Sequence, residues 1–155
     1  MASQAVLLQA HDELEVLTSG EGFQRIDRSL NRWIASTSIQ AGVLHLTCLH
    51  TSASLTINEN ADPRVLDDLA AWMRRVAPEI GVNSLGAKGG YHRYRHDDEG
   101  DDDMPAHIRT ALTSQTLSLS VVDGRLQLGT WQAVYLCEWR SRGSARRIAL
   151  HLLGS

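Results

Sequence analysis

Three histidines stand beside hydroxyl or carboxylate side chains and are the first candidates for chemistry: His50, His96 and His107. His50 ends an apolar run and opens His50-Thr51-Ser52, and a strand end projects side chains from a rigid scaffold, as a ligand or catalytic group requires. Imidazoles are common zinc ligands, and three of them with one open position are typical of a catalytic zinc site. Because the spacing matches no compact metal motif, a three-histidine site is a hypothesis rather than a conclusion.

A run of six carboxylates between Asp97 and Asp103 offers a second kind of metal site. Hard cations prefer carboxylate oxygens, so Asp97 and Asp98 could hold magnesium against the phosphates of a substrate. The competing interpretation is a solvated acidic loop whose last members favour the N-terminus of a helix. That interpretation explains Asp101 to Asp103 well and explains His96 and Asp97 less well, because a basic and aromatic run directly precedes them.

Polar residues also occur at two of the segments expected to form strands. Asn58 and Glu59 precede Asp62, and helix capping and turn formation explain Asp62 but explain Glu59 poorly. Gln132 closes a Gly-Thr-Trp-Gln sequence and would share a strand face with apolar residues. An amide buried without a partner costs about 1–3 kcal/mol. The partner of Gln132 could be a ligand, a neighbouring subunit or the acidic loop, and a structural interpretation stays open beside the functional one.

The remaining histidines and the two cysteines have simpler interpretations. His11, His45 and His151 lack polar neighbours in the sequence, so we interpret them as hairpin or sheet-surface histidines. Cys48 and Cys137 both lie in apolar strand-like runs, which favours reduced core thiols in a cytoplasmic protein over a disulfide.

Composition limits the class of protein. The chain has 155 residues, 43% of them hydrophobic and 21% charged, which indicates one ordinary globular domain spanning residues 1–155. A net charge of −3 argues against a nucleic-acid or anionic-membrane binder, which would carry a basic stripe. No apolar run approaches the roughly 18 residues of a transmembrane helix.

Hydrophobic periodicity predicts the elements that must position these groups. Apolar and polar residues alternate in several short runs, which predicts strands at residues 5–9 and 13–18 (as a hairpin), 43–50, 54–58, 117–121, 126–139 and 145–153. We expect a loop from Gly81 to Gly90, since that segment is rich in glycine and has no hydrophobic period. The pattern as a whole predicts one α+β domain with a largely antiparallel sheet.

A helical period predicts two or three helices. The first covers residues 20–38. The second is capped by Asp62, has Pro63 in its first turn and ends at Pro78. Its apolar stripe consists of Val65, Leu66, Leu69, Trp72, Met73 and Val76. A short third helix begins near Asp103, with Met104, Ile108 and Leu112 on its expected buried side.

Three motifs, in this order along the chain, resemble the YjbQ-like family, whose members are named secondary thiamine-phosphate synthases. The resemblance covers nearly the whole chain and rests on His50-Thr51-Ser52-Ala53 through Asn58-Glu59-Asn60-Ala61-Asp62-Pro63, His96-Asp97-Asp98-Glu99-Gly100 through Met104-Pro105-Ala106-His107, and Gly124-Arg125-Leu126 through Gly129-Thr130-Trp131-Gln132. It implies a small α+β fold with a β-sandwich and a compact homotrimer. It also implies that hydroxymethylpyrimidine pyrophosphate and thiazole phosphate are joined to give thiamine phosphate. The family often has Pro or Asn after the Glu-Gly pair, where this chain has Asp101.

The resemblance, taken with the residue types, gives a hypothesis for the site. Histidines 50, 96 and 107 bind a divalent metal or the phosphate, while Asp97 and Asp98, with Glu99, hold magnesium on the pyrophosphate. Glu59 orients a histidine or acts as a base. The expected substrate-binding residues are Thr51, Ser52, Asn58, Gln132, Arg93 and Arg95. The two arginines, together with Lys88, would clamp phosphate from the loop.

Two other functions fit the same residues. One is a metal-dependent hydrolase acting on a small phosphorylated or amide substrate, which three histidines would equally serve. The other is a non-catalytic trimeric protein that binds a small anionic metabolite. Metal content separates the alternatives, because tight zinc retention favours hydrolase chemistry and dependence on added magnesium favours pyrophosphate chemistry.

Overall fold

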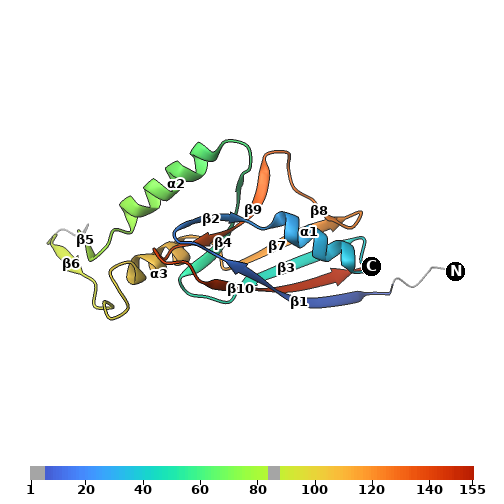
Figure 1. Ribbon diagram of the computed structural model, residues 1–155, viewed down its shortest axis with the longest axis horizontal. Helices are drawn as coiled ribbons and strands as arrows, with labels where there is room; N and C mark the ends of the chain where they lie inside the picture. Colours follow the sequence, from blue (N-terminus) through green and yellow to red (C-terminus); the bar gives the residue numbers. More distant parts are fainter. Residues whose placement is uncertain (1–5, 84–87) are drawn as a thin grey trace.

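Antiparallel strands dominate the computed structural model, which describes residues 6–83 and 88–155 (Figure 1). The strands are β1 (Leu8–Leu17), β2 (Gly22–Arg25), β3 (Gly42–Cys48), β4 (Ala53–Glu59), β5 (Gly81–Asn83), β6 (Tyr91–Arg93), β7 (Thr116–Val122), β8 (Arg125–Leu126), β9 (Gln132–Glu138) and β10 (Ala145–Gly154). The helices are α1 (Asp27–Ser36), α2 (Pro63–Val76) and α3 (Asp103–Leu112).

Two sheets enclose the main core. The larger has the strand order β1-β10-β3-β7-β8 and the smaller β2-β9-β4, with antiparallel pairing throughout. Leu44 and Leu46 on β3 and Leu136 on β9 are fully buried, and α1 adds Leu30 and Ile34 to the same core. The prediction of a single α+β domain with mostly antiparallel strands is confirmed.

The N-terminal hairpin prediction is wrong. Residues 8–17 form one continuous strand, and His11 and Asp12 pair with His151 and Leu150 of β10 instead of turning the chain. Pairing over ten residues with a distant strand satisfies the backbone groups that a turn would leave to water. The predicted helix over residues 20–38 is shorter, because residues 22–25 pair with β9 and the helix begins only at Asp27.

The predicted strand over residues 126–139 is also interrupted. β8 ends at Leu126 and β9 begins at Gln132. Between them a turn is closed by Gln132, whose backbone N–H donates to the Gly129 carbonyl (3.0 Å) and whose Oε1 accepts from the Gly129 N–H (2.8 Å). In the segment expected to be a loop, Gly81–Asn83 pairs with β6, while residues 84–87 lie outside the described part of the chain.

Helix α2 follows the predicted boundaries closely. Asp62 precedes it and accepts a hydrogen bond from the Arg64 N–H (3.0 Å), and Pro63 occupies the first turn. Of its apolar stripe only Met73 is buried, and Trp72 is 54% exposed. In Figure 1 the helix projects from the sheets, and the described part of the chain leaves Trp72 and Val76 on its apolar side exposed. Within the two described ranges, no helix is long and apolar enough to cross a membrane.

The expected buried side of α3 is wrong. Leu112 is 55% exposed, while Arg109 and Thr110 are buried. Hydrophobic periodicity fails to identify this face because a charged side chain can be buried when it has partners. The Arg109 guanidinium donates to Glu21 Oε2 (2.7 Å) and to the Ala77 carbonyl (2.9 Å). A paired and hydrogen-bonded charge can occupy a position that sequence patterns assign to an apolar side chain.

Both cysteines are free and buried, as predicted. Burial raises the pKa of the Cys137 thiol to about 12, and it also raises the pKa of Cys48. Since the thiolate is the reactive form, we expect both thiols to resist Ellman's reagent at pH 8 in the native protein and to react at once in 6 M guanidinium chloride. Rapid labelling of the native chain would contradict this packing.

Candidate functional site

Two imidazoles converge on one carboxylate oxygen at the start of α3. His96 Nε2 lies 2.6 Å and His107 Nε2 lies 3.3 Å from Asp103 Oδ2. The Asp103 side chain is 2% exposed, whereas those of His96 and His107 are 43% and 30% exposed. These three side chains are the group within the described residues whose ligand atoms are arranged to hold a metal ion. A buried carboxylate thus lies beneath two imidazoles that solvent can reach.

A hydrogen bond from His107 fixes which of its ring nitrogens lies toward Asp103. Its Nδ1 lies 2.9 Å from the Thr51 carbonyl oxygen, which can only accept, so Nδ1 carries a proton. The other ring nitrogen, Nε2, then lies 3.3 Å from Asp103 Oδ2 and is the atom that could bind a metal cation together with this carboxylate. A ring N–H fixed by a carbonyl is the usual outer-sphere support for a metal-binding histidine.

The fold positions this group through the first turn of α3. Asp103 and His107 are four residues apart on the helix, so their side chains lie on one face. The loop after β3 supplies the Thr51 carbonyl, and the segment after β6 supplies His96. The second Asp103 oxygen, Oδ1, accepts from the Arg140 guanidinium, which fixes the carboxylate from behind.

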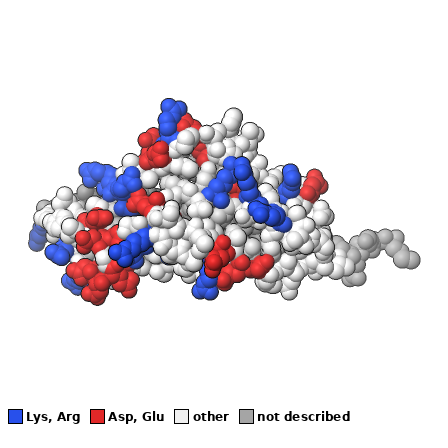
Figure 2. Space-filling model, viewed as in Figure 1, with Lys and Arg blue, Asp and Glu red and all other residues white. Residues whose placement is uncertain are grey.

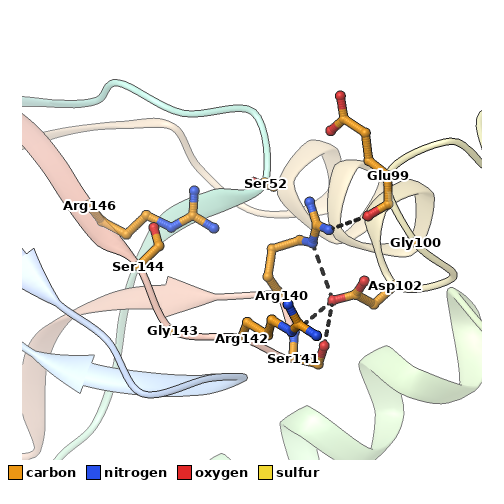
Figure 3. A pocket seen from close by; sticks show the side chains of 10 residues that line it. All are labelled: Ser52, Glu99, Gly100, Asp102, Arg140, Ser141, Arg142, Gly143, Ser144 and Arg146. Carbon is orange, nitrogen blue, oxygen red and sulfur yellow. Dashed lines mark hydrogen bonds and ion pairs between the residues drawn. The ribbon is translucent and has the colours of Figure 1, made fainter.

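A pocket of about 560 Å³ lies directly beside this group (Figure 3). Figure 3 shows the guanidinium groups of Arg140 and Arg146 reaching toward the same hollow, with the Glu99 carboxylate turned away. Hydroxyls of three serines complete a lining suited to phosphate oxygens. The lining residues are Ser52, Glu99, Gly100, Asp102, Arg140, Ser141, Arg142, Gly143, Ser144 and Arg146.

Asp102 ties this pocket to the Asp103 group. Its Oδ2 accepts from the Ser141 N–H (2.7 Å), the Ser141 hydroxyl (2.9 Å) and Arg140 Nε (3.2 Å). Burial alone would raise the pKa of Asp102, but the hydrogen bonds from Ser141 and the Arg140 charge outweigh it and lower the pKa to about 2. Arg140 therefore joins two adjacent carboxylates and is held rigid between the pocket and the histidines.

The lowered pKa of Asp102 predicts a pH-dependent stability. The carboxylate has an ordinary pKa of 3.8 when unfolded, so its contribution is fully present above that value and is lost as the pH falls toward 2. We expect Asp102→Asn to lower the free energy of unfolding by about 2 kcal/mol at pH 6, and the difference from wild type to shrink toward zero near pH 2. Urea denaturation at several pH values measures this, with Asp98→Asn as the exposed control. A difference independent of pH would contradict the assignment.

A buried ion pair forms the wall of the pocket opposite Asp102. Arg146 donates from Nε and Nη2 to the two Glu138 oxygens at 2.7 and 2.6 Å. Glu138 also accepts from the Thr18 hydroxyl (2.8 Å) and the Arg140 N–H (3.0 Å). Burial opposes the charge, but these donors and the Arg146 charge together lower the pKa of Glu138. For Arg142, by contrast, no carboxylate of the described residues lies within 4.0 Å, so its charge is available to a ligand.

His50 is not part of the metal-binding group. Its Nε2 accepts a hydrogen bond from the Arg147 N–H (2.8 Å), and its carbonyl accepts from the Gln115 amide (2.6 Å). Burial lowers the pKa of His50, and the charges of Arg146 and Arg147 lower it further. A neutral His50 lines a second hollow of about 440 Å³, which shares Ser52 with the arginine-lined pocket.

Of the charged residues expected to bind a pyrophosphate, Glu99 borders the pocket with its carboxylate turned away, and the others lie outside the lining. Asp97 is exposed and pairs with Arg93 at 3.7 Å, and Asp98, Arg95 and Lys88 are also exposed. Figure 2 shows acidic side chains crowded at the end of the molecule where this segment runs. The carboxylate that meets His96 and His107 is instead Asp103, which the sequence pattern suggested only as a helix cap.

Glu59, Asn58 and Gln132 gather at the other end of β4. Glu59 pairs in register with Gln132, its Oε1 accepts from the Ala61 N–H (3.0 Å), and Asn58 Oδ1 accepts from the Glu59 N–H (2.8 Å). Glu59 lies six positions along the strand from Ala53, a span of about 20 Å. Within one chain, these residues therefore do not meet Thr51, Ser52 and the histidines.

Sequence reasoning missed the arginine-lined pocket. Arg140 and Arg142 fall in the segment between β9 and β10 that was expected to be only a turn, and Arg146 lies at the start of β10. Two signals could have found the site: three arginines interleaved with serine and glycine, and an Asp-x-x-x-His spacing at the start of a helix, which puts Asp103 and His107 on one face.

Comparison with known proteins identifies the family. The family model described as "UPF0047 protein YjbQ-like" matches residues 12–155. The chain belongs to this family. It is 41% identical over 155 residues to a UPF0047 protein of Synechocystis sp., covering 99% of each chain. It is 40% identical over 142 residues to the UPF0047 protein YjbQ of Escherichia coli O157:H7, covering 91% of this chain and 95% of the relative.

Solved structures of family members share the fold. A conserved hypothetical protein of Thermus thermophilus is 34% identical with a TM-score of 0.72, covering 91% of this chain and 98% of that one. A YjbQ/UPF0047 family protein of Clostridium acetobutylicum is 27% identical with a TM-score of 0.77, again covering 91% and 98%. The family resemblance drawn from the motifs is thereby confirmed.

Proposed function

We propose that this YjbQ-like protein is a metal-assisted enzyme acting on a small phosphorylated substrate. The observation that carries the proposal is that Arg140 connects the candidate metal site to the pocket. Its guanidinium binds Asp103, which lies against His96 and His107, and Arg140 also lines the pocket together with Arg142 and Arg146. A divalent cation on His96, Asp103 and His107 would neutralise charge that develops on a leaving phosphate or pyrophosphate. The arginines and serines would hold the phosphate oxygens in the adjoining pocket.

The reaction we assign is formation of thiamine phosphate. The thiazole nitrogen attacks the methylene carbon of hydroxymethylpyrimidine pyrophosphate, a carbon–nitrogen bond forms, and the carbon–oxygen bond breaks to release pyrophosphate. No proton needs to be abstracted, so the chain contributes binding, orientation and charge stabilisation. Arg142 would contact the pyrophosphate directly, while Arg140 keeps Asp103 in place. Ser52 borders both hollows and would lie between the two substrates.

The test is thiamine phosphate formation from the two precursors, measured with chelator-treated protein, with added Zn²⁺ or Mg²⁺, and with His96→Ala. His96 is a suitable target because its side chain is 43% exposed, so its removal should leave the fold intact. We expect activity in the wild type only with metal, and a loss of about 100-fold in the variant. Wild-type and variant protein that perform alike, or are both inactive, would contradict the proposal. Metal-dependent release of phosphate without thiamine phosphate would favour the hydrolase alternative.

We also propose that the chain assembles as a homotrimer in the cytoplasm. Trp72 and Val76, one turn apart on α2, are exposed by 54% and 37%, and Trp131 is exposed by 64%. Large exposed apolar side chains are typical of protein interfaces. Free thiols at Cys48 and Cys137 are compatible with a reducing compartment.

Light scattering after size exclusion tests the assembly. We expect three times the chain mass of 17.1 kDa, and a smaller particle for Trp72→Glu. Val122→Glu, at an exposed position on β7, is the control. A wild-type particle with the mass of a single chain would contradict the proposal.

A further inference from the structure

Three arginines surround a hollow of about 390 Å³ between α1 and β8, here called the α1–β8 hollow. Arg28 and Arg32 come from α1, and Arg125 is the first residue of β8. All three are exposed, and Figure 2 shows basic side chains gathered where Figure 1 places α1 and β8. The α1–β8 hollow shares no residue with the pocket beside Asp103, and Figure 1 shows α1 and α3 well apart.

The charge of these arginines is not neutralised within the described part of the chain. None of the three guanidinium groups has a carboxylate oxygen of a described residue within 4.0 Å. Of the carboxylates next to them in the sequence, Asp27 accepts from Arg25 through both oxygens (2.7 and 3.0 Å), and Asp123 is exposed. Arg28 and Arg32 are four residues apart on one helix, a like-charge pairing that destabilises a helix. An anion in the hollow would offset this repulsion.

Small residues leave room between the arginines. Ala35 lies on the same face of α1 as Arg28 and Arg32 and adds only a methyl group. Gly124 has no side chain, and its φ of +68° suits a glycine in the turn before β8. Leu30, elsewhere on the circumference of α1, is fully buried in the core. The packing of α1 therefore fixes where its arginines stand, while the hollow itself stays open.

Asn31 joins the two sides of the α1–β8 hollow and adds a hydrogen-bond donor to it. Its Oδ1 accepts from the Leu126 N–H (2.8 Å), which identifies the amide oxygen, because a backbone N–H can only donate. The amide nitrogen then carries two N–H donors, and no hydrogen bond to an acceptor is found for them among residues 6–83 and 88–155. Asn31 thus holds β8 beside α1 and offers donors to a ligand in the hollow.

We propose that the α1–β8 hollow binds the phosphate groups of a small phosphorylated metabolite. Planar guanidinium groups bind phosphate oxygens through paired N–H donors, and the lining contains no acidic side chain that would repel an anion. A volume of about 390 Å³ is at the lower end for small-molecule pockets. The lining has neither a carboxylate nor an imidazole to move a proton, so we assign the site to an effector and not to a substrate. The proposal does not depend on the function proposed above.

The experiment is a ¹H–¹⁵N NMR titration of the whole chain with inorganic pyrophosphate, at an ionic strength kept constant with sodium chloride. Because each amide reports its own site, binding at the α1–β8 hollow is separated from binding at the pocket beside Asp103. We expect saturable shifts for amides of residues 28–35 and 124–126. Removing one charge-assisted contact should weaken this binding about tenfold in Arg32→Gln and, independently, in Arg125→Gln.

Arg75→Gln is the matched control, because it removes the same charge from an exposed arginine on α2, outside the hollow. It should bind pyrophosphate as the wild type does, and circular dichroism shows that each variant is folded. Shifts at residues 28–35 that follow ionic strength alone, or no saturable shifts there, would overturn the proposal. It is also overturned if either Arg32→Gln or Arg125→Gln keeps the wild-type affinity, since the two arginines would then not act on one ligand.

Discussion

Replacing Asp103 with Asn is expected to weaken Zn²⁺ binding by about 100-fold or more and to abolish the proposed activity. The change removes the charge on which His96 and His107 converge, and it leaves the Arg140 guanidinium without one of its two carboxylates. Because the Asp103 side chain is 2% exposed, no solvent shell replaces these contacts. Calorimetric titration of Zn²⁺ and the thiamine phosphate assay measure the two effects separately.

Asp101→Asn is the matched control, since it removes one negative charge from an exposed residue two positions away. It should bind Zn²⁺ as the wild type does. A loss of stability in Asp103→Asn could also reduce binding, so His107→Ala serves as a second variant in which Arg140 keeps both of its carboxylates. Unchanged Zn²⁺ affinity in both Asp103→Asn and His107→Ala would rule out a metal on these residues.

Local signals in the sequence were sufficient for some elements. The Asp62 cap and Pro63 specify the start of α2, because a side-chain acceptor and a fixed φ angle act within one turn. Alternation of apolar residues located β3, β7 and β10, where one face is buried in the core. Residues 11 and 12 were wrongly predicted to form a turn, because their conformation depends on a distant strand and not on local signals. They resemble a turn locally, and only pairing with residues 150 and 151 makes them part of a strand.

The candidate site was predictable only in part. Motif recognition and residue type pointed to His96 and His107, which the structure does bring together. They could not select Asp103 among six neighbouring carboxylates, because that choice depends on Arg140, 37 residues further along the chain. The pocket depends on the same kind of long-range contact. Its acidic and basic sides come from separate segments, and their complementarity is visible only after folding.

Breaking the Arg146–Glu138 ion pair at the pocket wall should destabilise the fold strongly. We expect Arg146→Met to lower the free energy of unfolding by about 3–5 kcal/mol, because it leaves the Glu138 carboxylate buried without a countercharge. The side chains are 7% and 2% exposed, so water cannot compensate. Chemical denaturation monitored by circular dichroism measures the change, and the thermal midpoint should fall by about 10 °C.

The neighbouring Arg147 provides the matched control, because it lies on the opposite face of the same strand. It is 54% exposed and its contact with Glu13 is 3.6 Å, so Arg147→Met should cost less than about 1 kcal/mol. Adding Glu138→Gln to Arg146→Met should recover part of the lost stability, because the unpaired charge is gone. The amide oxygen can still accept from the Arg140 N–H, and the amide nitrogen can donate to the Thr18 hydroxyl oxygen. If Arg146→Met and Arg147→Met were equally stable, the charge of Glu138 would have to be compensated by something other than Arg146.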